Sequence, residues 1–172
     1  MKKLKEIYKG SVLDLSRFSN KSFEVVLNLG SYYHLCNKDD RKKSIDETLR
    51  VLKPGGIYMI SYINRYANYL THFEEFKHDF DFLERYIESG HIDDSSLFYA
   101  TNPEMIEEEL SDFPLQQLHN VATDGPTFFY KDVINEMKDK EFKKIMNLHI
   151  KLCHNMSNLG NSEHGLIIAR KI

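Results

Sequence analysis

The apolar positions of this chain alternate between strand-like runs and helix-like stripes. The β-branched and apolar run from Phe23 to Leu29 predicts a strand that is buried on both faces. Ile45, Leu49 and Leu52 recur at the spacing of one helix face, so one stripe of this helix is expected to pack on a sheet. The apolar run from Ile57 to Ile63 predicts the next strand.

Capping and turn residues mark the ends of these elements. Residues 37–40 offer an N-cap and early negative charge for the first helix. The sequence Lys53-Pro54-Gly55-Gly56 ends it, because proline cannot continue a helix and glycine takes the positive φ of a tight reversal. Thr101-Asn102-Pro103-Glu104 predicts a second capped start, with Ile106 and Leu110 on its inner face.

The carboxyl-terminal part continues the alternation. We predict a strand from Leu115 to Thr123, a helix from Val133 to Met156, a turn from Ser157 to Asn161 and a last strand from Gly165 to Ala169. Strands that alternate with helices favour an α/β fold with parallel pairing. Residues 64–99 differ, because they are rich in aromatic and acidic residues and show weak helical periodicity. They are expected to form a variable insertion or lid over the carboxyl ends of the strands.

The order of these elements resembles the second half of a class I S-adenosylmethionine (SAM)-dependent methyltransferase. The resemblance rests on the strand at 23–29, the loop Gly30-Ser31-Tyr32-Tyr33-His34-Leu35, the helix and the Lys-Pro-Gly-Gly strand. The segment from Glu163 to Lys171 is similar to the family's last strand. The resemblance implies an incomplete Rossmann-like sheet, mostly parallel with an antiparallel C-terminal strand. It also implies SAM as cofactor and transfer of a methyl group to a small molecule.

The family's glycine-rich cofactor loop has no counterpart in this sequence, whose eight glycines are scattered. In the family, that loop follows the first strand, and an acid that ends the second strand holds the ribose. Residues 1–172 are therefore expected to form a single methyltransferase-like domain that lacks its first two strand–helix units. Activity and SAM binding by this chain alone are doubtful on this interpretation. The alternatives are a truncated non-enzymatic remnant that acts as an oligomer or partner-binding module, or one half of a split methyltransferase.

The resemblance implies a cofactor site near the amino-terminal end of the chain. Asp14, followed by Leu15, stands where the family places an acid that accepts a hydrogen bond from the adenine amino group, a role that suits a carboxylate. The alternative is that Asp14 caps the next turn. Three residues at the end of the strand at 23–29 would pass beside the methionine part of SAM, namely Asn28, Leu29 and Gly30. His34, in the loop that follows, would either contact a ligand or have a structural role.

The predicted acceptor residues follow the strands on the same rim. They are Tyr33, Asn64, Arg65 and Tyr66. Arg65 is expected either to hold an anionic acceptor bidentately or to form a salt bridge with a nearby acid. Methyl transfer needs mainly the in-line positioning of two reactants, so no catalytic residue is assigned.

Charge and cysteine content narrow the partners. The net charge of −3 gives no broad basic surface for nucleic acid or an anionic membrane, and no apolar run reaches the roughly 20 residues of a transmembrane helix. Cys36 and Cys153 stand far apart, which favours reduced thiols and a cytoplasmic location. His72 and His78 lack ligand spacing, so no metal is expected.

The strand at 23–29 also carries a prediction about assembly. In the family, the first strand pairs with it, so here it is expected to lie at the edge of the sheet. No lysine or proline inside it protects that edge. We therefore expect a homodimer through this edge, or pairing of the edge with Ser11–Leu13 of the same chain.

Overall fold

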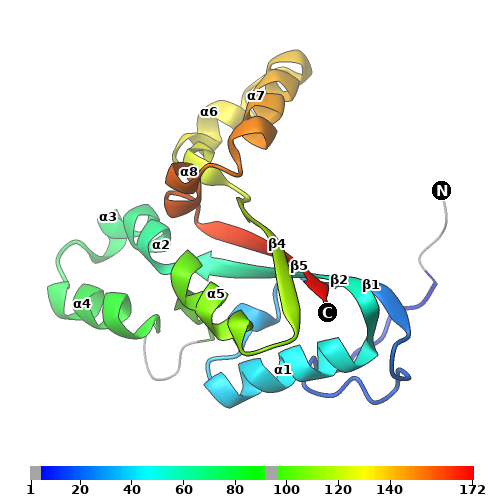
Figure 1. Cartoon of the computed structure of the whole chain (residues 1–172). Coiled ribbons are helices and arrows are strands. Elements are labelled where there is room, and N and C mark those ends of the chain that lie inside the picture. Colours follow the sequence, from blue (N-terminus) through cyan, green and yellow to red (C-terminus); the bar gives the residue numbers. More distant parts are fainter. Residues whose placement is uncertain (1–4, 92–96) are drawn as a thin grey trace.

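The computed structural model describes residues 5–91 and 97–172 and is built around one five-stranded sheet (Figure 1). The strand order is β1-β2-β5-β4, and β3 pairs with β2. β2 is parallel to β1 and β3, whereas β5 is antiparallel to β2 and β4. The predicted sheet, with its antiparallel last strand between two neighbours, is therefore confirmed. The strands are β1 (Phe23–Asn28), β2 (Leu52–Asn64), β3 (Ala100–Thr101), β4 (Leu115–Ala122) and β5 (His164–Lys171).

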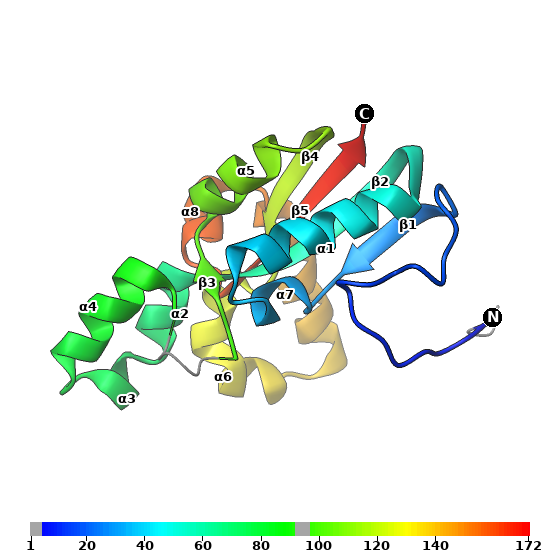
Figure 2. The same ribbon diagram turned by 90° about the horizontal axis from the view of Figure 1, so that it is seen from below.

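The helices form three groups around this sheet. α1 (Lys38–Val51) and α5 (Pro103–Ser111) lie side by side on one face, as the view from below shows (Figure 2). Both begin at the predicted caps, Asn37 and Asn102. Short helices follow the carboxyl end of β2, and others connect β4 to β5. The helices after β2 are α2 (Arg65–Thr71), α3 (Phe73–Phe76) and α4 (Phe80–Ser89). The helices between β4 and β5 are α6 (Lys131–Asn135), α7 (Asp139–Leu152) and α8 (Met156–Gly160). Two 3-10 turns complete the list, η1 (Tyr32–His34) and η2 (Gly125–Tyr130).

The main core lies between the sheet and the pair α1 and α5. The predicted stripe residues Ile45 and Leu49 are buried there, as are Ile106 and Leu110. Each large apolar side chain removed from water contributes about 1.5–3 kcal/mol. An ion pair links the two helices, because Arg41 Nε on α1 lies 3.3 Å from Glu109 Oε1 on α5.

The opposite face of β1 is uncovered, which corrects the prediction of a strand buried on both faces. Val25 is 49% and Leu27 is 56% exposed, because no described helix covers this side of the strand. β1 is an edge strand of the sheet, as predicted, and pairs with β2 alone. Ser11–Leu13 forms no strand and does not pair with this edge.

Three predicted elements differ in detail. Lys53–Gly56 lies inside β2, where it forms a bulge that moves the register from Phe23↔Leu52 to Val25↔Ile57. The turn there uses Gly55 at a φ of +75°. The single helix predicted from Val133 to Met156 is broken into shorter helices, and the turn predicted at 157–161 is largely the helix α8. None of the residues of α6 or α7 is buried, so their apolar stripe has too little packing to hold one continuous helix.

No helix within the described ranges is both long and apolar enough to cross a membrane.

Candidate functional site

A cavity of about 380 Å³ lies where the carboxyl end of β2 meets α2, α4 and the start of β5. Most of its wall comes from the segment 64–99, which was expected to cover the strand ends. Gly90 ends α4 at a φ of +76°, and a side chain there would collide with the Ala100 carbonyl oxygen. The described residues that line the cavity are Ile63, Asn68, Tyr69, His72, Glu75, Phe76, Phe82, Leu83, Tyr86, Gly90, Phe98, Ala100, Glu163 and His164.

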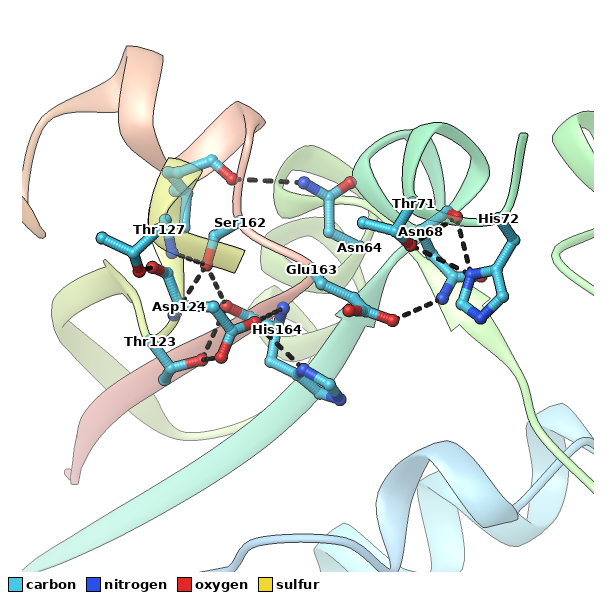
Figure 3. A network of polar contacts seen from close by, with 12 residues as sticks. Asn64, Asn68, Thr71, His72, Thr123, Asp124, Thr127, Ser162, Glu163 and His164 are labelled. Carbon is cyan, nitrogen blue, oxygen red and sulfur yellow. Dashed lines mark hydrogen bonds and ion pairs between the residues drawn. The ribbon is translucent and has the colours of Figure 1, made fainter. Parts of the chain in front are cut away.

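A buried carboxylate, Glu163, stands in the wall of this cavity (Figure 3). Its side chain is held from one side by Asn68, whose Nδ2 donates to Glu163 Oε1 at 2.8 Å. Asn68 Oδ1 in turn accepts the Tyr86 hydroxyl. Burial raises the pKa of Tyr86, so that hydroxyl stays a protonated donor. Glu163 Oε2 is buried and has no hydrogen-bond partner within the described part of the chain.

Beside Glu163, His164 forms an ion pair with Asp124. The His164 Nδ1 atom lies 3.1 Å from Asp124 Oδ2, and the His164 backbone N–H donates to the same oxygen at 2.7 Å. Burial alone would raise the pKa of Asp124, but the hydrogen bonds from His164 outweigh burial and lower that pKa. The hydrogen bond to Asp124, opposed by burial, raises the pKa of His164. The pair therefore favours an ionised carboxylate and a protonated imidazole.

Ser162 fixes this pair in place. Its hydroxyl accepts the backbone N–H groups of Gly125 and Asp124, at 2.8 and 3.1 Å, and donates to the His164 carbonyl at 2.6 Å. These bonds join the loop after β4 to the start of β5. Ligand-type atoms of Asp124, Glu163 and His164 consequently all lie within 4.8 Å of one another.

The residue pattern along the chain did not predict this cluster. Asp124 lies 40 residues before His164, so the cluster has none of the close histidine and cysteine spacing that marks a metal site in a sequence. A signal was present, because Glu163-His164 stands at the start of the last strand and Asp124 follows the strand before it. Antiparallel pairing of Ala122 with Gly165 brings those two strand ends together.

The predicted adenine contact, Asp14, lies in an exposed turn away from the cavity. Its Oδ1 accepts the Ser16 backbone N–H at 2.9 Å, which is the alternative role of a turn cap. Hydrogen bonds from the Ser16 side chain and backbone lower the pKa of Asp14. Leu15 follows in the same loop, and its backbone N–H donates to Glu47 Oε2 on α1 at 2.8 Å. No strand precedes these residues in the described range.

The three residues predicted at the end of β1 differ in burial and in contacts. Asn28 is buried, and its Oδ1 accepts the Tyr32 backbone N–H at 3.1 Å, so it shapes the entry to η1. Leu29 is 58% exposed. A Cβ on Gly30 would meet its nearest atom, the Tyr33 hydroxyl oxygen, at 3.6 Å. Nothing inside the described chain therefore requires glycine at this position.

Tyr33 and His34 lie next to the cavity. The Tyr33 ring centroid is 6.1 Å from that of His164, and the His34 ring centroid is 4.6 Å from that of Phe98. His34 Nδ1 also lies 2.9 Å from the Leu97 carbonyl oxygen. His164 and Phe98 both line the cavity. Tyr33 and His34, the two predicted residues, therefore lie directly behind its wall.

The three residues predicted after β2 are separated by their packing. Asn64 is buried, caps α2 and donates to the Leu159 carbonyl at 3.2 Å. The buried Arg65 guanidinium donates to the carbonyls of Ala100, Ile87 and Glu88 rather than to an acid or to the cavity. Neither expectation for Arg65 describes these contacts. Tyr66 is exposed and accepts a long hydrogen bond, 3.5 Å, from Asn102.

Residues 2–60 match the family model described as a methyltransferase domain. A search of curated proteins gave no match. Similar solved structures include a SAM-dependent methyltransferase from Methanosarcina mazei, with 17% identity, a TM-score of 0.54 and coverage of 95% of this chain and 65% of that one.

Two further solved methyltransferase structures are similar to this chain. A Thermotoga maritima SAM-dependent methyltransferase, described as a possible histamine N-methyltransferase, has 16% identity and a TM-score of 0.53, with 96% of this chain and 63% of that one covered. A Haloferax volcanii methyltransferase solved with its activator has 18% identity and a TM-score of 0.50, with 94% and 59% covered. This chain thus spans less than two thirds of the length of these structures. It resembles the class I SAM-dependent methyltransferases and has their fold.

Proposed function

We propose that this chain forms the acceptor-binding part of a SAM-dependent methyltransferase that acts on a small molecule. The match of residues 2–60 and the fold support this class of activity. The observation that carries the proposal is the cavity of about 380 Å³ at the carboxyl end of β2. Ligands of open α/β sheets bind beside the carboxyl ends of strands, and pockets for small molecules begin at about 300 Å³.

The chemistry of the cavity wall favours a neutral or amine-bearing acceptor. Aromatic rings, among them Tyr69, Phe76 and Phe82, supply apolar contact area. The acids in the wall are Glu75 and Glu163, and no lysine or arginine stands among its described residues. The imidazolium of His164 also lines the wall, but its charge is already paired with Asp124. An anionic acceptor would meet repulsion here, whereas a protonated amine would meet a carboxylate and ring faces.

The cofactor would approach from the end of β1. Gly30 fits this role, because a side chain is absent there without an internal structural reason. Asn28 is already bonded within the chain, and Asp14 lies in an exposed turn, so few of the predicted contacts are arranged for SAM. We therefore propose weak SAM binding by these 172 residues alone.

SAM, when bound, supplies an electrophilic methyl group. The chain's own contribution is to hold the acceptor so that its lone pair lies in line with that group. The cavity also removes water from around the acceptor. An amine acceptor would have to react as its free base, so its proton would pass first to water or to a carboxylate of the wall such as Glu163. No side chain needs to form a covalent intermediate.

The test is transfer of label from methyl-labelled SAM at millimolar concentration to a panel of small amines, alcohols and carboxylates. Label is expected on amines or alcohols and not on carboxylates. His72→Trp, which fills the cavity, is expected to reduce transfer at least about tenfold, the effect of a misplaced reactant. His78→Trp, an exposed matched control, is expected to leave transfer unchanged. Transfer to carboxylates, or equal transfer by both variants, would contradict the proposal.

A second candidate function, association with another chain, is favoured by β1. Its exposed apolar face and unpaired edge provide a template for a further strand. We infer that a second copy of this chain pairs with this edge, which is the predicted homodimer. This candidate also suits one half of a split methyltransferase, whose other half would supply a strand beside β1.

A further inference from the structure

We propose that Asp124, Glu163 and His164 form a binding site for one divalent first-row metal ion, such as Zn²⁺ or Mn²⁺, in the wall of the cavity. The site lies where the loop after β4 meets the start of β5 (Figure 3). One ligand-type atom from each residue lies within 4.8 Å of the other two. The inference does not depend on the proposed methyl transfer.

The donor set suits such an ion. Two carboxylates and one imidazole are ligands that Zn²⁺ and Mn²⁺ accept. The His164 Nδ1 and Asp124 Oδ2 atoms are 3.1 Å apart. Two ligands that each lie about 2.1 Å from one metal ion are separated by about 3.0–3.4 Å. These two atoms therefore already have the separation of neighbouring ligands, and an ion would replace the hydrogen bond between them.

Glu163 supplies the independent observation. Its side chain is buried, at 7% exposure, yet Oε2 has no hydrogen-bond partner within the described chain. An unpaired buried carboxylate oxygen is costly. Figure 3 shows that Asn68 holds the other oxygen and that Oε2 is turned toward the side of His164. A cation placed between Glu163, Asp124 and His164 would satisfy this oxygen.

Charge points the same way. None of the salt bridges within the described residues gives Glu163 a lysine or arginine. With a divalent ion and neutral His164, the net charge of the group is zero. Asp124 and Ser162 fix the loop that carries the ligands, so little ordering is needed on binding.

The remaining coordination positions would face the cavity. Glu163 and His164 both line it, and their three-residue site leaves room for further ligands around the ion. A small molecule in the cavity that carries a hydroxyl or amine group could occupy one of these positions. The metal site and the small-molecule cavity would then act as one binding surface.

The experiment titrates the full chain, freed of metal with a chelator, with Zn²⁺ alone and with Mg²⁺ alone by calorimetry. One Zn²⁺ per chain is expected at micromolar concentration, with Mg²⁺ much weaker because imidazole suits zinc. Glu163→Gln, which keeps the acceptor for Asn68, is expected to weaken Zn²⁺ at least about tenfold, as is Asp124→Asn. Zn²⁺ binding only near millimolar concentration, or equal binding by Glu163→Gln, would overturn the inference.

Two measurements keep the test specific. His119 and His154 have ring centroids 5.1 Å apart and form a rival site, so His119→Asn is the matched control. It is expected to leave Zn²⁺ affinity unchanged, and a loss there would overturn the assignment. A wild-type measurement avoids any folding defect of the variants. Mn²⁺ is expected to broaden the amide resonances of Gly125 and Gly165 first, and broadening centred on His119 instead would contradict the site.

Discussion

The acceptor side and the cofactor side of the predicted methyl-transfer site are built very differently in this chain. On the acceptor side, Glu163, Asn68 and Tyr86 form a partly buried, hydrogen-bonded network in the wall of a cavity. On the cofactor side, Asp14 is exposed and Leu29 is 58% exposed, at the end of an edge strand. Such a network holds its geometry before a ligand arrives, whereas exposed side chains must be ordered by the ligand.

The sheet shows the same contrast between its two faces. α1 and α5 cover one face with a packed core, while Val25 and Leu27 remain exposed on the other side of β1. Parallel sheets are usually covered on both faces. We infer that the cofactor side needs further protein surface over this face of β1 before it is complete. The following predictions test this contrast, beginning with the largest effect.

Removing the Arg65 side chain should damage the acceptor side most. Arg65→Ala would leave the carbonyls of Ala100, Ile87 and Glu88 without their donors. We expect the free energy of unfolding to fall by about 3 kcal/mol or more, as measured by urea titration. Arg85→Ala, on the exposed side of α4, should change it by less than about 0.5 kcal/mol. Equal small losses in both variants would mean that these buried bonds do not hold the cavity wall.

A charge on the uncovered face should break association. Leu27→Lys places an ammonium on the apolar side of the edge strand, which is how natural edge strands avoid pairing. If two chains pair through β1, dimer affinity measured by sedimentation over a dilution series should fall at least about tenfold, or about 1.4 kcal/mol. The exposed Leu148 on α7 provides the control Leu148→Lys. A wild-type monomer at all concentrations would contradict pairing at this edge.

The Asp124–His164 pair should make stability depend on pH. The pKa of His164 is raised, so its contribution is complete below its ordinary value near 6.5 and is lost as pH rises through the raised value. The pKa of Asp124 is lowered, so its contribution is present above about 3.8 and is lost as pH falls through the lowered value. Because both groups are partly exposed, we expect a loss of at most about 1 kcal/mol between pH 6 and 8.5.

This effect can be isolated by comparing two proteins. Asp124→Asn should return the pKa of His164 toward its ordinary value and remove this part of the pH dependence. Imidazole resonances followed by NMR, together with urea titrations at several pH values, provide the measurement. An unchanged His164 titration in the variant would show that the ion pair does not set it.

The smallest effect is expected at Asp14. Its carboxylate caps an exposed turn through Ser16, so Asp14→Ala should change the free energy of unfolding by no more than about 0.5 kcal/mol. SAM binding by this chain should be equally weak before and after the change. A clear loss of SAM affinity in the variant, followed by calorimetry, would restore the predicted adenine contact.

The sequence predicted elements whose signals are local, and failed where distant packing decides. Caps at Asn37 and Asn102 and the buried stripe of Ile45 and Leu49 followed from spacing alone. The exposure of Val25 did not, because an apolar strand carries no information on whether a helix covers it.

The candidate site shows the same limit. Arg65 was correctly placed after β2, but its partners are backbone carbonyls that no residue pattern reveals. The Asp124–Glu163–His164 cluster depends on strand pairing across 40 residues. It could have been predicted only by combining the sheet order with the two strand ends.

We propose that the acceptor side is complete in this chain while the cofactor side is not. The most direct test is a ¹H–¹⁵N NMR titration of the full chain, first with 2-phenylethylamine as an acceptor-like probe and then with SAM. We expect the probe to shift the amide resonances of Gly90 and Ala100 in the cavity wall, and SAM at submillimolar concentration to leave those of Leu29 and Gly30 unmoved. The proposal would be contradicted if the probe left the resonances of Gly90 and Ala100 unshifted while micromolar SAM shifted those of Leu29 and Gly30 to saturation.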